Sequence, residues 1–210
     1  MFKTIESNVS AEITVKKSKF IANVFYVESI EEAENKIKEI NKKYYDSRHN
    51  CYAFSIYSKS GKIQRFSDNG EPSGTAGAPM LSILEGMDLS NVLVIVTRYF
   101  GGILLGTGGL VRAYSDATKE ALQKANIINM ELGLSAYFEV AYSNLEKIKY
   151  YFETNNIEIT DQKFDENVKL FVNISEEKFE QTIDNKEKLN FEILTFGKIE
   201  KKYIKSIDFL

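Results

Sequence analysis

The order of apolar and polar residues along the chain distinguishes several strands from the helices between them. Alternation over residues 12–27 predicts a strand or hairpin arm, and the run NCYAFSIY at 50–57 predicts another strand. The run NVLVIVT at 91–97 is almost continuously apolar and β-branched, which is typical of a buried strand. Ser29, followed three residues later by Glu32, forms a capping box ahead of helically spaced apolar residues.

Turn-forming residues separate the other elements expected in the first part of the chain. In chain order, we expect a turn at 59–62, a strand at 62–66, a loop at 67–74, a helix from a Thr75 cap to Gly86, a break at 101–102, a turn at 106–109 and a helix at 110–125.

The second part of the chain repeats a strand–helix–strand pattern. We expect a strand at 134–142, a helix capped by Ser143 or Asn144 and running to about 155, strands at 156–162 and 167–174, a helix capped by Ser175 and running to about 185, and a strand at 190–200. This βαββαβ order is the ferredoxin-like one.

Glycine and proline are concentrated in the first part of the chain, which predicts two domains. Ten of the twelve glycines and both prolines precede residue 130, and the sequence NMELGLS at 129–135 offers turn chemistry. We therefore expect an α+β protein with one domain at 1–132 and a ferredoxin-like domain at 133–210.

Composition excludes several classes of site. A single cysteine, Cys51, rules out an intrachain disulfide and favours a reducing compartment. A single histidine, His49, rules out the usual Cys/His zinc site within one chain, and we expect no metal or cofactor. No apolar run reaches the length of a membrane span and the N-terminus lacks a signal-like apolar region, so we expect a cytoplasmic protein with no membrane partner.

Charge differs between the two parts of the chain. Residues 1–130 hold 16 Lys and Arg against 14 Asp and Glu, whereas residues 131–210 hold 11 against 16. The first part is therefore the better candidate for an anionic partner, and the acidic second part argues against RNA binding there.

The first Gly-rich segment, residues 67–79, combines carboxylates and hydroxyls with glycines that permit sharp turns. Asp68 and Glu71 offer acid/base groups, and Ser73 and Thr75 offer hydroxyls beside the start of a helix. The alternative is a structural loop in which Asp68 forms an Asx turn and Thr75 caps the helix.

The second Gly-rich segment, residues 97–114, resembles a phosphate cradle but matches neither of the common phosphate-binding motifs. Arginines flank it and are able to bind an anion through two nitrogens. The candidate anion or nucleic-acid ligands are Arg98, Arg112, Thr75, Thr107, Gly106, Gly108 and Gly109. The alternative is that the two arginines pair with the acids of the first segment and fix one loop to the other.

His49 and Cys51 share one face of a strand, which suggests a Cys–His nucleophile pair. Residues two apart on a strand have parallel side chains about 6.6 Å apart, which is a poor geometry for a short hydrogen bond. A free cysteine is also commonly just buried. Ser73 has no evident His/Asp partners beyond a notional pairing with His49.

Together these segments resemble the IMPACT/YigZ family. The resemblance runs from about residue 10 to 125 and rests on four stretches. These are KKSKFIA at 16–22, HNC at 49–51, DNGEPSGTAG at 68–77, and NV at 91–92 followed by TRYFGG at 97–102 and LVRAY at 110–114. The family usually has a second acid where Asn69 stands and often a basic residue where Ala78 stands.

The resemblance implies a fold and suggests a role. The first domain would be similar to domain 2 of ribosomal protein S5 and domain IV of elongation factor G, and the second to domain V of that factor. Eukaryotic relatives act in translational control by competing for a ribosome-associated activator of the starvation-response kinase, whereas the bacterial members have no settled biochemical role.

Three hypotheses follow. The first is a translation-associated binding protein that contacts the ribosome, RNA or a translation-control partner through Arg98, Arg112 and exposed basic residues. The second is a hydrolase-like enzyme acting on a small anionic or peptide substrate, with Asp68 and Glu71 as acid/base groups. The third is a structural role for both loops, with function in a protein–protein surface near Tyr99 and Phe100.

Overall fold

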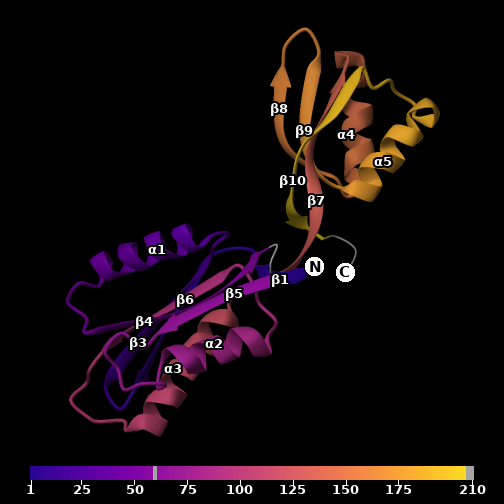
Figure 1. The fold of residues 1–210 in the computed structure, drawn as a ribbon. Helices are drawn as coiled ribbons and strands as arrows, with labels where there is room; N and C mark the ends of the chain where they lie inside the picture. The colour runs from indigo at the N-terminus through magenta and orange to yellow at the C-terminus, as the bar shows by residue number, and fades with distance from the viewer. Residues whose placement is uncertain (59–60, 207–210) are drawn as a thin grey trace. The chain divides into compact units, whose positions relative to one another are not determined.

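The computed structural model describes residues 1–58 and 61–206, and the chain divides into two compact units. The first unit comprises residues 2–128, and the second comprises residues 129–210 together with Met1. Both units mix helices with a sheet (Figure 1), which confirms the predicted two-domain α+β organisation.

The first unit contains the hairpin, strands and capped helix expected from the alternation pattern. Its elements are β1 (Phe2–Ile5), β2 (Val9–Val15), β3 (Ser18–Tyr26), α1 (Ile30–Lys43), β4 (His49–Ser58), β5 (Gly61–Ser67), α2 (Gly77–Gly86), β6 (Val92–Tyr99) and α3 (Thr107–Leu122). Of the turn expected at 59–62, Lys59 and Ser60 lie outside the described residues.

The sheet of the first unit is antiparallel, with strand order β2-β3-β6-β4-β5. Its central strand, β6, is the predicted buried run, and residues 92–98 are buried on both faces. Helix α1 covers one face, and α2 and α3 cover the other (Figure 1). The strand is apolar throughout because helices exclude water from both of its sides.

Helix α1 begins as its capping sequence predicts. The Ser29 hydroxyl accepts a hydrogen bond from the Glu32 N–H at 3.1 Å. The Glu32 carboxylate accepts one from the N–H of Glu28 at 2.8 Å, one residue before the position that a standard capping box uses.

Two expectations near the glycines were wrong. Helix α3 begins at Thr107 rather than at 110, so Gly108 and Gly109 belong to its first turn instead of forming a turn before it. The sequence at 129–135 forms no turn, because β7 (Ile127–Val140) passes through it as one uninterrupted strand. The domain limits of 1–132 and 133–210 stay a prediction.

The second unit follows the expected βαββαβ order. After β7 come η1 (Tyr142–Asn144), α4 (Leu145–Thr154), β8 (Glu158–Phe164), β9 (Val168–Ser175), α5 (Glu176–Asp184), η2 (Lys186–Lys188) and β10 (Thr195–Lys205). The strands lie in the order β10-β7-β9-β8, which is the ferredoxin-like arrangement, and β1 also pairs with β7.

The core of the second unit lies between α4, α5 and one face of its sheet. Phe138, Phe152 and Phe179 meet there with ring centroids 5.3 and 5.6 Å apart. The Ser175 hydroxyl caps α5 by accepting from the Lys178 N–H, as predicted. Asn144 precedes α4 without a side-chain capping bond, and β10 begins five residues later than expected.

Helices throughout the described ranges are short. The longest, α3, has 16 residues. Within residues 1–58 and 61–206, no helix combines the length and the apolar character needed to cross a lipid bilayer.

Candidate functional site

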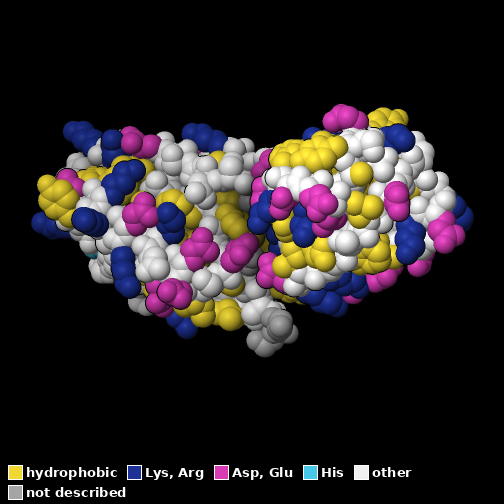
Figure 2. All heavy atoms as spheres, turned by 90° about the horizontal axis from the view of Figure 1, so that it is seen from above, with side chains coloured by type: hydrophobic (Ala, Val, Ile, Leu, Met, Phe, Trp, Pro, Cys, Tyr) yellow, Lys and Arg dark blue, Asp and Glu magenta, His cyan; other side chains and the backbone are white. Residues whose placement is uncertain are grey.

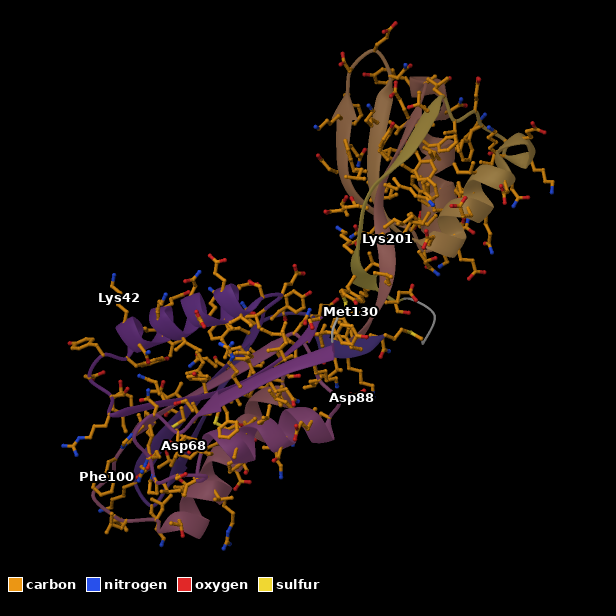
Figure 3. The ribbon with its side chains drawn as sticks, in the orientation of Figure 1. Lys42, Asp68, Asp88, Phe100, Met130 and Lys201 are labelled. Carbon is orange, nitrogen blue, oxygen red and sulfur yellow. The ribbon has the colours of Figure 1, made fainter. Side chains whose placement is uncertain are left out.

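Both Gly-rich segments lie at one end of the first unit's sheet. The register places the start of β3, the start of β4 and the end of β6 together, since Lys19 pairs with Tyr99 and His49 pairs with Arg98. The end of β5 reaches the same end, and Figure 3 shows Asp68 and Phe100 there, with Asp88 toward the other end. We call this region the loop end; it comprises residues 16–18, 46–50, 67–76 and 99–112.

A buried polar network links the two segments beneath the surface of the loop end. Glu71 accepts hydrogen bonds at Oε1 from Arg98 Nη1 at 2.7 Å and from the Tyr114 hydroxyl at 2.9 Å. The Glu71 and Arg98 side chains are only 3% and 7% exposed. The Cys51 thiol donates to the Asp68 carbonyl at 2.9 Å and contacts the Tyr114 hydroxyl at 3.3 Å.

Arg98 is therefore paired inside the protein, which was one of the two alternatives that the sequence left open. Its guanidinium lies 5.5 Å from the ring centroids of both Phe20 and Phe100, and its charge is matched by Glu71. Withdrawing it to meet a phosphate would leave Glu71 as an unpaired buried carboxylate, which is strongly unfavourable. For Arg98 the pairing alternative is the correct one.

Asp68 caps helix α2 from outside the helix. Its carboxylate accepts hydrogen bonds from the N–H groups of Gly74, Ala76 and Gly77, at 2.8, 3.0 and 2.8 Å. Partial burial acts to raise the pKa of Asp68, but the three donors outweigh it and the pKa lies below its ordinary value. A carboxylate held in this way is a poor general base.

Thr75 does not cap α2, so that expectation was wrong. The capping position is Ala76, and the Thr75 hydroxyl donates to the Pro72 carbonyl at 2.6 Å. With its hydroxyl turned into the loop and its side chain buried, Thr75 does not present an anion-binding group.

The suggested Cys51–His49 pair is not formed. Cys51 is fully buried, and burial raises the pKa of its thiol to about 12. His49 Nδ1 instead lies 2.9 Å from the carbonyl oxygen of Asn69. Burial thus favours the protonated thiol, which is a much weaker nucleophile than a thiolate.

The remaining predicted anion ligands lie on the surface. Gly106, Thr107 and Gly108 are exposed at the beginning of α3, which has no side-chain cap, and Gly109 is half-buried. Arg112 is exposed in the second turn of α3 and forms no ion pair with a described residue. Ser73 is exposed in the first segment, with no described base beside it.

Sequence reasoning missed the most exposed apolar residues of the loop end. Phe100, Ile103 and Leu104 are 51%, 42% and 82% exposed between β6 and α3. Among them only Phe100 was expected to be exposed. The available signal for Ile103 and Leu104 was their position between Gly102 and Gly106, where no strand or helix was expected to bury them.

Gly101 holds this loop against the hairpin of β2 and β3. A Cβ atom at Gly101 would overlap the backbone of Lys17, so only glycine fits there. The Gly101 N–H donates to the Ser18 hydroxyl at 3.1 Å. The apolar residues that follow are thus presented from an anchored backbone.

Neither a metal site nor the cavity of the second unit is a stronger candidate than the loop end. Across residues 1–58 and 61–206, no three His, Cys, Asp or Glu side chains cluster in a way that could hold a metal ion. A cavity of about 320 Å³ lies in the second unit, lined in part by Glu131, Glu158, Asn173 and Lys178. Its lining includes none of the candidate catalytic or anion-binding residues named from the sequence.

Both units match known protein families. Residues 16–122 match the model described as the Impact N-terminal domain, and residues 138–185 match a domain of unknown function, DUF1949. An IMPACT family member of Haemophilus influenzae is 38% identical over 179 residues, which cover 83% of this chain and 85% of that protein. IMPACT family member YvyE of Bacillus subtilis is 35% identical over 173 residues, covering 82% and 79%.

A solved structure has the same fold. A crystal structure described as that of a hypothetical protein matches 95% of this chain and 97% of its own length, with a TM-score of 0.62 and 28% sequence identity. The similarity therefore extends over both units and is not limited to the Gly-rich segments.

Proposed function

This chain belongs to the IMPACT family, and from that premise we propose that it is a translation-associated binding protein acting in the cytoplasm. Its partner would be the ribosome, RNA or a translation-control protein. The loop end of the first unit would make the contact.

One observation carries the proposal: the loop end uses its reactive groups internally and presents binding groups externally. Glu71, Arg98 and Cys51 are buried in one network, and Asp68 is occupied by backbone donors. Outside, the loop end carries the exposed apolar side chains of Phe100, Ile103 and Leu104 and the exposed basic side chains of Lys17 and Arg112. Such a surface is suited to holding a partner rather than to transforming a substrate.

The enzyme hypothesis has less support from the same geometry. Asp68 and Glu71 would have to give up their donors before acting as acid or base, and the Cys51 thiol is protonated at neutral pH. Among the described residues of the loop end, no serine, threonine or cysteine side chain lies within hydrogen-bond distance of a carboxylate or imidazole base, which is the usual requirement for activating such a nucleophile.

Ribosome sedimentation tests the proposal. The tagged chain should sediment with ribosomes from lysate at low salt and dissociate as salt rises, because lysine and arginine contacts to phosphate or carboxylate are screened. Reversing two exposed charges, Lys17→Glu with Arg112→Glu, should lower the bound fraction about tenfold.

The matched control is Lys119→Glu with Lys124→Glu, which changes net charge equally in the later part of α3 and just beyond it, where both residues are exposed. It should sediment like the unmodified chain. Absence of sedimentation at low salt, or equal loss in both double variants, would count against the proposal.

A further inference from the structure

Within the proposed function, we infer that the partner bound by the loop end is a protein. Its surface would offer an apolar recess for Ile103 and Leu104, with Asp and Glu side chains around the rim. The inference rests on the proposed function for the location of the site and adds the chemistry of what binds there.

The exposed apolar loop at residues 100–104, which we call the tip, favours a protein partner over a nucleic acid. Ile103 and Leu104 are aliphatic, and Leu104 is 82% exposed. Single-stranded nucleic acids are held by stacking bases on aromatic or guanidinium planes, which aliphatic side chains do not provide. The aromatic side chain of the tip, Phe100, already packs beside the Arg98 guanidinium at 5.5 Å. Aliphatic anchors instead gain free energy by filling an apolar recess.

The tip is also anchored where it begins. Gly101 is hydrogen-bonded to Ser18 and sits against the backbone of Lys17, and Phe100 is packed on Arg98. A loop anchored in this way loses less conformational entropy on association, so a small apolar contact can contribute usefully to affinity.

Charge around the tip points to an acidic rim on the partner. Lys16, Lys17, Arg48 and Arg112 are exposed, and none forms an ion pair with a described residue. In Figure 2, which views the first unit from the side of α1, Lys and Arg side chains are interspersed with Asp and Glu side chains.

The acids of the loop end do not cancel this positive charge by pairing with it. Asp46 accepts from the Tyr99 hydroxyl at 2.7 Å, Asp68 accepts from three backbone N–H groups, and Glu71 is buried with Arg98. Carboxylates placed opposite the four cations would speed association and fix its orientation.

Photo-crosslinking in cells tests the inference. The full chain carries p-benzoylphenylalanine in place of Leu104, and a matched control carries it in place of Tyr150, which is 69% exposed in the second unit. After irradiation, adducts are purified under denaturing conditions and divided between ribonuclease and protease treatment. The crosslinked peptide is then sequenced by mass spectrometry.

We expect an adduct at position 104 that resists ribonuclease and is digested by protease. Its crosslinked segment should contain apolar residues with Asp or Glu nearby. Adding Lys17→Glu and Arg112→Glu should reduce the adduct about tenfold, whereas Lys119→Glu with Lys124→Glu should leave it unchanged.

Three results would overturn the inference: a ribonuclease-sensitive adduct, a yield no higher than at position 150, or a yield unaffected by charge reversal at 17 and 112. The outcomes also separate the two proposals. A ribosomal RNA adduct would end this inference and leave the proposed function standing. An adduct with a protein that has no role in translation would end the proposed function and leave this inference standing.

Discussion

Glu71 joins the two Gly-rich segments through hydrogen bonds of its side chain. One of its oxygens accepts from both Arg98 on β6 and Tyr114 on α3. Because all three side chains are buried, each would otherwise face the cost of an unpaired polar group. The hydrogen bonds of Glu71 to Arg98 and Tyr114 therefore fix the loop at 67–76 to the sheet and to α3.

Removing one partner of the Glu71–Arg98 ion pair should destabilise the first unit strongly. Arg98→Met leaves the Glu71 carboxylate buried without its cation, and we expect the free energy of unfolding to fall by about 3–5 kcal/mol. The double variant Glu71→Leu with Arg98→Met removes both charges and should recover part of that loss. Urea unfolding followed by far-ultraviolet circular dichroism measures both.

Arg112→Met is the control for this experiment. Arg112 is exposed, so its replacement should change the free energy of unfolding by no more than about 0.5 kcal/mol. If Arg98→Met behaved like Arg112→Met, the buried network would not have the structural importance assigned to it.

The sequence identified the residues of this network but not their roles. Arg98 and Arg112 both looked able to bind an anion or to pair with Asp68 and Glu71. Arg98 is buried and paired, whereas Arg112 is exposed. The difference arises from contacts between residues 27 and 43 positions apart, which local spacing does not encode.

At the scale of elements, helix α2 owes its start to a residue outside itself. Asp68 supplies the acceptors for the N–H groups of Ala76 and Gly77, the function that a capping side chain next to the helix usually performs. The loop and the helix should therefore lose order together.

Replacing Asp68 tests this coupling and its pH dependence. Asp68→Ala should lower the free energy of unfolding at pH 7 by about 1–2 kcal/mol, since three backbone donors lose their acceptor. The pKa of Asp68 is depressed in the folded state. Its contribution is thus present above the ordinary carboxylate pKa and is lost as pH falls through the folded value.

Urea unfolding at several pH values measures this dependence. The difference between Asp68→Ala and the unmodified chain should shrink as pH is lowered below about 4. Asp116→Ala, at an exposed position on α3, serves as the control. A difference that persists unchanged at acidic pH would contradict the assigned role of the ionised carboxylate.

Strands and helices marked by an apolar run or a capping residue were predictable from the sequence. Element boundaries that depend on packing against other parts of the fold were not. The apolar run of β6 and the capping residues Ser29 and Ser175 gave correct strands and helices. The start of α3 was misplaced because its glycines are read as turn formers, although packing of the buried residues that follow favours helix from Thr107 onward.

At the scale of the whole molecule, the two units have separate apolar cores. Phe20, Met80 and Tyr114 belong to a core of the first unit, and Phe138 and Phe152 belong to that of the second. The α+β class and the ferredoxin-like order were predictable because they depend on the sequence of elements. The packing of the loop end was not, because it depends on side-chain contacts across the sheet.

A core truncation in one unit should loosen that unit alone. Phe138→Ala should reduce the stability of the second unit by about 3–5 kcal/mol. Hydrogen exchange read by mass spectrometry should then show faster exchange in peptides from 129–206 and unchanged exchange in peptides from the first unit.

Phe54→Ala, in the core beneath α1, should give the opposite pattern. If either substitution accelerated exchange along the entire chain equally, the two cores would not be separate cooperative units.

The lysines of β10 should oppose association between copies of the chain at high protein concentration. This strand pairs with β7 alone among the described strands, and it carries Lys198, Lys201, Lys202 and Lys205. Lys198 and Lys201 pair with Glu180 and Glu176 of α5, but stacking the same strand from two copies would still crowd eight lysines together. Repulsion of this kind disfavours fibre growth through β10, although no further described strand covers that edge of the sheet.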